Sequence, residues 1–170
     1  MDIKEVKGGV CAPVGFKANG IHCGIRRNKT KRDFALIVSD VRAAAAGVYT
    51  SNLVKGAPVI VTKKNLADGY AQAIICNSGN ANTCNADGIE IAEKMCSLVT
   101  REGGIAASDV IVGSTGVIGQ PLSIEPMDSG MGELWSGLGD NSDYAAQAIM
   151  TTDTVMKSVS VEFKLGGKVC

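Results

Sequence analysis

The sequence has little excess charge, few aromatic residues and no long apolar run. Lysine plus arginine and aspartate plus glutamate both number 17 among 170 residues, so the formal net charge is zero. Proteins that bind nucleic acid or a membrane surface need surplus basic residues, so neither partner is expected. Apolar runs such as 59–61 are far shorter than the roughly 18 residues of a membrane span. No apolar segment follows Met1, so we predict no secretory signal and a cytoplasmic protein.

The sequence also lacks the usual patterns of metal sites and of nucleophilic catalysis. None of its six cysteines forms a Cys-x-x-Cys pair, and the only histidine, His22, lies beside Cys23. Structural zinc requires ligands at characteristic spacings, so we expect no metal and interpret the cysteines as reduced, mostly buried thiols. No Ser-His-Asp set with a supporting motif, His-Glu-x-x-His motif or Walker loop occurs. The chain therefore offers groups that stabilise charge but no evident nucleophile.

Hydrophobic residues make up 45% of the chain and glycine contributes 21 positions, which indicates one folded domain over residues 1–170. Short apolar and β-branched runs predict strands. They lie at 34–39, 48–51, 57–62, 71–76 and 110–112. Helical spacing predicts a helix over 87–100, which Gly103 and Gly104 end. The charged run 26–33 reads as a solvated turn between strands, with a phosphate-binding patch as the alternative.

The last third of the chain predicts two more helices and a hairpin. Met127, Met131 and Leu134 share one helical face, and Asn141 or Ser142 caps a helix that reaches 149. Residues 158–163 alternate, with Val159, Val161 and Phe163 predicted to point inward, and 165–168 form a turn. The return strand stops after about three residues, which would leave backbone N–H and C=O groups of the first strand without hydrogen-bond partners. We therefore expect a polypeptide that is incomplete alone, as a processed subunit, a fragment or one chain of a swapped assembly, with an ordinary frayed terminus as the alternative.

Three polar stretches follow apolar elements, at 77–82, 113–119 and 150–154. We predict that these stretches form polar loops mounted on rigid elements, where binding and catalytic groups are commonly held. The Thr115 hydroxyl and the Gly116 N–H are adjacent donors that can converge on one oxygen, as an oxyanion hole requires. Their Gly-x-x-Gly-x-x-Gly spacing is not a dinucleotide fingerprint, and a structural turn stays open as an alternative. The threonines of the third stretch could cap, line a strand or bind a substrate carboxylate or amide.

Seven stretches, in order along nearly the whole chain, resemble the glutamate N-acetyltransferase/ornithine acetyltransferase family of arginine biosynthesis. They are 8–16, 20–24, 36–40, 44–52, 77–82, 114–119 and 150–154. The resemblance implies an α+β fold, a layered sandwich of helices and sheets with a site of the N-terminal-nucleophile type. It also implies the α chain of a precursor that cuts its own backbone before a threonine. That threonine is the nucleophile and begins the β chain.

By the same resemblance, Thr115 and Gly116 stabilise the oxyanion and Thr152 binds substrate. Thr151 and Thr154 lie close to Thr152, so the register within this motif stays open. Two α and two β chains are expected to assemble in the cytoplasm. The implied chemistry is ping-pong acetyl transfer from N-acetylornithine to glutamate through an acetyl-threonine, without cofactor or metal.

Two other functions fit the sequence less fully. One is a self-processing aminopeptidase on a similar scaffold, and the other is a non-catalytic module whose glycine-rich segments bind a phosphate or nucleotide. The sequence leaves open whether acetyl-CoA also donates acetyl groups, whether pathway products inhibit and how the tetramer packs. It also leaves open why the chain stops at Cys170, before the expected cleavage point.

Overall fold

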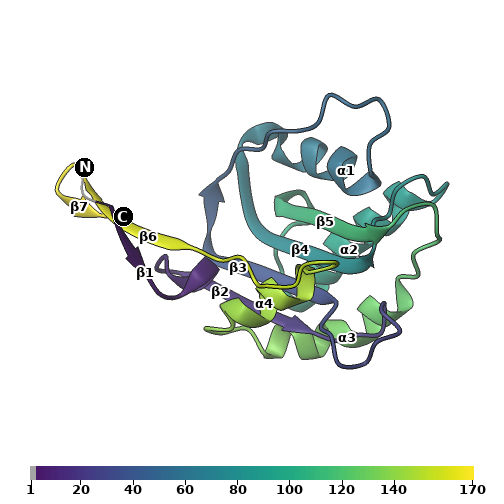
Figure 1. Ribbon diagram of the computed structural model, residues 1–170. Helices are drawn as coiled ribbons and strands as arrows, with labels where there is room; N and C mark the ends of the chain where they lie inside the picture. The colour runs from purple at the N-terminus through teal and green to yellow at the C-terminus, as the bar shows by residue number, and fades with distance from the viewer. Residues whose placement is uncertain (1–2) are drawn as a thin grey trace.

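A four-stranded sheet forms the centre of the molecule in the computed structural model, which describes residues 3–170 (Figure 1). The strand order is β2-β3-β4-β5, comprising β2 (Phe16–Ile21), β3 (Phe34–Ala44), β4 (Tyr70–Asn80) and β5 (Val110–Val117). The first three strands are antiparallel, whereas β5 runs parallel to β4. A parallel pair needs a long crossover, and the chain between β4 and β5 supplies one that contains a helix.

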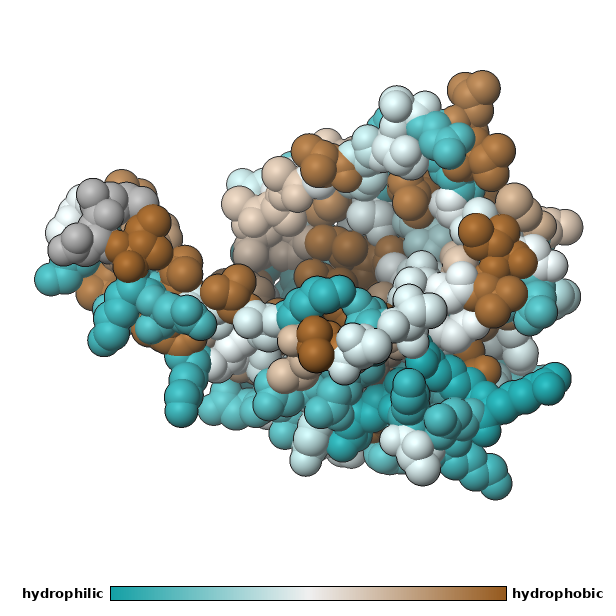
Figure 2. Space-filling model, viewed as in Figure 1, coloured by the Kyte–Doolittle hydropathy of each residue, from teal (hydrophilic) through white to brown (hydrophobic). Residues whose placement is uncertain are grey.

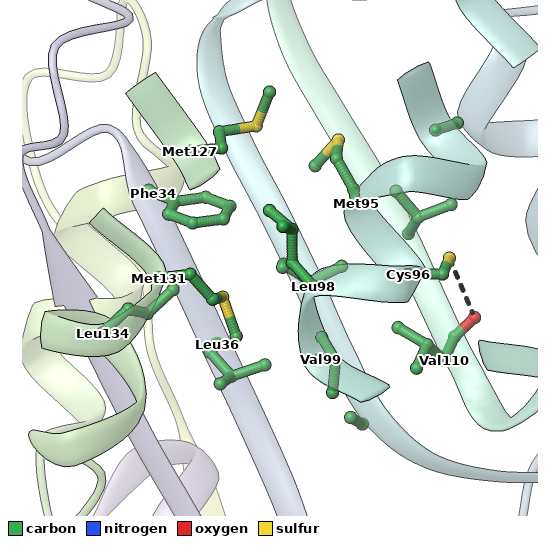
Figure 3. Packing of buried hydrophobic residues seen from close by; sticks show 14 of the residues in the cluster. Phe34, Leu36, Met95, Cys96, Leu98, Val99, Val110, Met127, Met131 and Leu134 are labelled. Atoms are coloured by element: carbon green, nitrogen blue, oxygen red, sulfur yellow. Dashed lines mark hydrogen bonds between the residues drawn. The ribbon is translucent and has the colours of Figure 1, made fainter. Parts of the chain in front are cut away.

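Three helices pack with one face of this sheet around the main core. They are α1 (Ala57–Asn65), α2 (Gly88–Gly103) and α3 (Glu125–Ser136). Phe34 and Leu36 of β3 are fully buried against Met131 and other apolar side chains of these helices (Figure 3). Burying such a side chain contributes about 1.5–3 kcal/mol, so this face supplies most of the hydrophobic stabilisation. The mixture of helices and sheet confirms the predicted α+β class.

Helix α4 (Ser142–Ile149) covers the β2 and β3 part of the opposite sheet face. The contact consists of small residues, with Ala18 and Ala35 of the sheet against Ala145 and Ala148 of the helix. At Gly20 a Cβ atom would come within 2.5 Å of the Tyr144 carbonyl carbon, so only glycine permits this approach. The abundance of glycine and the scarcity of aromatic residues therefore produce a helix seated very close to the sheet.

A second, three-stranded sheet projects from the body as an arm (Figure 1). Its order is β1-β6-β7, from β1 (Ile3–Val6), β6 (Ser160–Leu165) and β7 (Lys168–Val169). The predicted hairpin turn is confirmed, because Gly166 and Gly167 take φ values of 56° and 79°, as a type I′ turn requires. The prediction that Val159 and Val161 point inward is wrong. They are 73% and 47% exposed, since the arm extends away from the described core.

The strand predicted over 57–62 is wrong, because these residues form most of α1. Pro58 lies in the first turn of the helix, where its missing N–H costs nothing. The Thr62 hydroxyl donates to the Val112 carbonyl oxygen at 2.8 Å, and Val61 is buried in the main core. Tertiary packing thus overrides the β propensity of the Val-Ile-Val run.

The strand predicted over 48–51 is also wrong, because residues 45–56 contain neither helix nor strand. Val48 is completely exposed, so nothing holds this apolar residue in a sheet. The other predicted elements are confirmed with shifted ends, and Gly104 ends α2 in the left-handed conformation with φ 68°. Three short 3-10 turns complete the chain, η1 (Gly9–Cys11), η2 (Leu66–Asp68) and η3 (Ala107–Asp109). Across residues 3–170, no helix is both long and apolar enough to cross a membrane.

Candidate functional site

The carboxyl ends of the parallel strands β4 and β5 carry two of the polar stretches. Ser78 pairs with Thr115, and Gly79 pairs with Gly116. The sequence predicted loops here, but the pairing of β4 with β5 continues through both segments and makes them strand ends instead. In α/β structures, ligands bind beyond the carboxyl ends of parallel strands. The predicted oxyanion residues therefore occupy a favourable edge of the sheet.

Gly116 allows the two strand ends to touch. Its φ of +133° lies in a region that residues with a Cβ rarely adopt. A Cβ at this position would lie 2.6 Å from the Asn80 backbone nitrogen and also collide with the Gly79 backbone. Because no side chain shields it, the exposed Gly116 backbone remains open to a ligand.

Thr115 and Gly116 share an open pocket of about 520 Å³ with Thr151 and Thr152. Arg26, Gly79 and Val117 complete its lining. The fold thus brings together the second and third polar stretches, which are far apart in sequence. Thr154 does not line this pocket, so the structure favours Thr151 and Thr152 over Thr154 as the threonines that face a ligand.

The segment that carries Thr152 is held at both sides. The Asp153 carboxylate accepts a hydrogen bond from the Thr151 N–H at 3.3 Å and pairs with the Lys157 ammonium at 2.5 Å. The hydrogen bond from Lys157 lowers the pKa of Asp153 below its ordinary value, so this carboxylate stays ionised at neutral pH. On the other side, the Ser78 hydroxyl donates to the Ala148 carbonyl oxygen near the end of α4.

Arg26 is a pocket residue that the sequence interpretation missed. Residues 27–31 are exposed, as expected for a solvated turn, but Arg26 and Arg32 are partly buried. The Arg26 Nε donates to the Ser78 hydroxyl at 3.1 Å, and one of its Nη groups contacts the Met150 carbonyl oxygen. No pattern in the sequence separates Arg26 from the other cations of this run. Only the fold does so.

Asp33 holds the segment between β2 and β3 in place and thereby positions Arg26. Its side chain is fully buried, and its two oxygens accept the Cys23 and Arg26 backbone N–H groups at 2.7 and 2.8 Å. The His22 Nδ1 lies 3.1 Å from the same carboxylate. Hydrogen bonds between a carboxylate and backbone N–H groups are among the stronger kinds in proteins. The run 26–33 therefore ends in a buried carboxylate that fixes the backbone of the preceding segment.

The cysteines are all unpaired, but only part of the expectation about their burial is confirmed. Cys96 is buried, Cys84 and Cys170 are exposed, and the other three are intermediate. Burial raises the pKa of Cys96 to about 11 and that of Cys76 to about 12, so neither thiol supplies a nucleophilic thiolate at neutral pH. Within residues 3–170, no group of three potential metal-ligating side chains of His, Cys, Asp or Glu occurs.

Comparison with known proteins places these observations in a family. The family model described as the ArgJ family matches residues 17–170. The arginine biosynthesis bifunctional protein ArgJ of Caldanaerobacter subterraneus subsp. tengcongensis is 46% identical over 158 residues, which cover 92% of this chain and 39% of that protein. The chain thus spans about two fifths of the length of the curated relatives it matches.

Two crystal structures have the same fold. One is the arginine biosynthesis bifunctional protein ArgJ of Bacillus halodurans, with a TM-score of 0.92 and 34% identity, covering 99% of this chain and 89% of the other. The second is ornithine acetyltransferase of Mycobacterium tuberculosis complexed with ornithine. Its TM-score is 0.87 at 35% identity, and the match covers 94% of this chain and 88% of the other. These matches confirm the predicted fold type.

Proposed function

The chain belongs to the ArgJ family, and on that premise we propose that it is the α chain of an enzyme that moves the acetyl group of N-acetylornithine to glutamate. The observation that carries the proposal is the single pocket in which Thr115, Gly116 and Thr152 meet. One structural relative is an ornithine acetyltransferase complexed with ornithine, which supports the same substrate class.

In the proposed mechanism, the nucleophile is a threonine at the start of a β chain. Its hydroxyl gives its proton to its own α-amine and attacks the acetyl carbonyl carbon. The Thr115 hydroxyl and the Gly116 N–H stabilise the tetrahedral oxyanion. The C–N bond of the amide breaks, and ornithine leaves with a proton on its nitrogen. The amine of glutamate then attacks the acetyl-threonine ester, which yields N-acetylglutamate and restores the hydroxyl.

The described part of the chain leaves apolar sheet surface for such a partner. The face of β3, β4 and β5 beyond α4 presents Ile37, Ile74 and Ile111, which are partly or substantially exposed. Pockets of about 410 and 110 Å³ lie along this face, and neither contains Thr115, Gly116 or Thr152. Figure 2 shows hydrophobic residues gathered in the hollow between the arm and the body. We propose that the β chain covers this face in a cytoplasmic α2β2 assembly, with residues 1–170 as one domain.

Substitution of Thr115 tests the role of the oxyanion donor. In the complete assembly, Thr115→Ala should lower kcat about 10²-fold or more, because one donor to the oxyanion is lost. Thr115→Ser keeps the hydroxyl and should retain most of the activity. Turnover of N-acetylornithine with glutamate measures the effect, and size-exclusion chromatography checks that assembly is intact. Near wild-type turnover of Thr115→Ala would rule out this role.

Substrate trials separate the competing functions. The complete assembly should transfer acetyl groups to glutamate and leave small peptides uncut, whereas an aminopeptidase would do the reverse. A rise in melting temperature with nucleotides would instead favour a binding module. The relatives are named bifunctional, which supports acetyl-CoA as a second donor to be tried in the same assay.

A further inference from the structure

Arg26 contributes the only charged side chain among the described residues that line the pocket with Thr115, Gly116 and Thr152. The remaining lining consists of glycine, valine and threonine, all of them neutral. A charged group in an otherwise neutral pocket dominates which ligands enter it, because opposite charges attract strongly where solvent is partly excluded. The pocket is therefore biased toward an anion.

The guanidinium of Arg26 is held in place before any ligand binds. Its backbone N–H donates to the buried Asp33 carboxylate at 2.8 Å, which fixes the start of the side chain. The stem lies against Gly79, where a Cβ would come within 2.9 Å of the Arg26 Cγ. At the far end, Nε donates to the Ser78 hydroxyl at 3.1 Å and one Nη to the Met150 carbonyl oxygen. Such pre-organisation reduces the entropy lost on binding.

Among residues 3–170, no acidic side chain forms an ion pair with Arg26. The arginines that do form ion pairs there are Arg42 and Arg101. The acceptors that its side chain does contact are a hydroxyl and a backbone carbonyl, both neutral. A guanidinium has five N–H donors, and two are used here, so three remain. Arginine is suited to carboxylates because its parallel donors match the two carboxylate oxygens.

Taking the proposed function as its basis, we propose that Arg26 binds the α-carboxylate of the amino-acid substrates. N-acetylornithine and glutamate differ in their side chains but share this group, so one cation serves both halves of a ping-pong reaction. The carboxylate would lie between Arg26 and the threonines of 151–152, with the acetyl carbonyl directed to Thr115 and Gly116. Arg26 thereby selects acylated amino acids over simple acylated amines.

The test compares N-acetylornithine with N-acetylputrescine, which is the same molecule without its carboxylate. Both are assayed as acetyl donors to glutamate with the complete two-chain enzyme. Arg26→Met keeps an apolar stem to pack on Gly79 but removes the charge. Arg26→Lys keeps the charge but lacks the parallel N–H donors of the guanidinium. Arg27→Met is the matched control, because Arg27 is the exposed neighbour in the same run.

We expect the wild type to prefer N-acetylornithine. Arg26→Met should lower kcat/KM for this substrate about 100-fold, mainly by raising KM, because the charge-assisted hydrogen bonds to the substrate carboxylate are lost. It should change the value for N-acetylputrescine less than about threefold, and Arg26→Lys should recover part of the preference. Arg27→Met should behave as wild type.

Equal losses on both donors in Arg26→Met would overturn the inference, because Arg26 would then act only by holding the end of α4 through Met150. If Arg26→Met does not fold, the test uses Arg26→Lys and the wild type. If neither of them prefers N-acetylornithine to N-acetylputrescine, the inference is also overturned. A wild-type enzyme that transfers acetyl from neither donor would refute the proposed function itself, and the inference with it.

Discussion

Gly116 shows how much of the proposed site depends on one missing methyl group. Its backbone N–H can serve a ligand only if nothing covers it, and β4 and β5 can meet only if no Cβ separates them. Position 116 is a glycine with a φ of +133°, so no side chain covers its backbone and no Cβ separates the strand ends. The neighbouring Thr115 contributes a hydroxyl to the same pocket. In the proposed mechanism, these two adjacent residues at the end of one strand supply one side-chain donor and one backbone donor.

Substitution of Gly116 should damage both stability and activity. Gly116→Ala places a Cβ 2.6 Å from the Asn80 nitrogen, so the strand ends must separate. We expect the free energy of unfolding to fall by about 1–3 kcal/mol and turnover to fall by about 10²-fold or more. Urea denaturation and the acetyl-transfer assay measure these effects.

Gly132 provides the control for this substitution. It lies exposed in α3, and an added Cβ meets no atom within 4 Å. Gly132→Ala should raise the free energy of unfolding by about 0.5–1 kcal/mol, because alanine is the better helix former. Equal behaviour of the two variants would show that the close contact at Gly116 is wrong.

At the level of elements, the connection between β2 and β3 is held in place by the residue at its end, Asp33. Asp33 is buried immediately before β3 and accepts backbone N–H groups of Cys23 and Arg26. The exposed basic run thus becomes a loop whose two ends are hydrogen-bonded to each other, and Arg26 at its first end lines the pocket. Composition shows that this run contains several cations. It does not show which of them the Asp33 carboxylate holds in position.

Removal of the Asp33 carboxylate should release this loop. Asp33→Ala leaves two backbone donors without their acceptor, so we expect the free energy of unfolding to fall by about 2–4 kcal/mol. Acetyl-transfer activity should fall as well, because Arg26 loses its position. Asp40→Ala is the control, since its ion pair with Lys17 is about half exposed and should contribute little. Comparable losses in both variants would contradict the anchoring role.

The helices and strands were predictable to the extent that their side-chain period was clear. Helix α2 and strand β6 follow from period and turn residues, since helical spacing and alternation are local properties. Helix α1 was not predictable, because its β-branched run favours a strand and tertiary contacts, such as the burial of Val61 and the contact of Thr62 with Val112, oppose that preference. The strand ends at Gly79 and Gly116 were predicted as loops, because glycine favours turns unless two strands need to touch.

For the whole molecule, the two faces of the central sheet differ. One face is buried by α1, α2 and α3, whereas α4 covers only part of the other (Figure 1). The remainder of that second face is apolar in its strands, with Ile74 39% exposed. Contiguous exposed apolar surface commonly marks an interaction site. This asymmetry supports the proposed partner chain.

A charge on the uncovered face should disrupt assembly. Ile74→Lys introduces an ammonium where we propose that the β chain packs, so recovery of the α–β complex should fall about tenfold or more. Ile89→Lys is the control, because Ile89 is 46% exposed on α2, which packs with the opposite face of the sheet. Co-purification of the two chains followed by size-exclusion chromatography gives the result. Intact assembly of Ile74→Lys would argue that the partner binds elsewhere.

The sequence by itself determined most of the elements, because these depend on local pattern, and its motifs resemble the family, which in turn implied the α+β class. It also identified Thr115, Gly116 and Thr152 as site candidates, and the fold places all three in one pocket. The tertiary structure alone decided that Arg26 joins them and that Thr154 does not. The helical state of 57–62 and the uncovered sheet face are likewise tertiary results. Each depends on contacts between segments far apart in the chain, which no local pattern records.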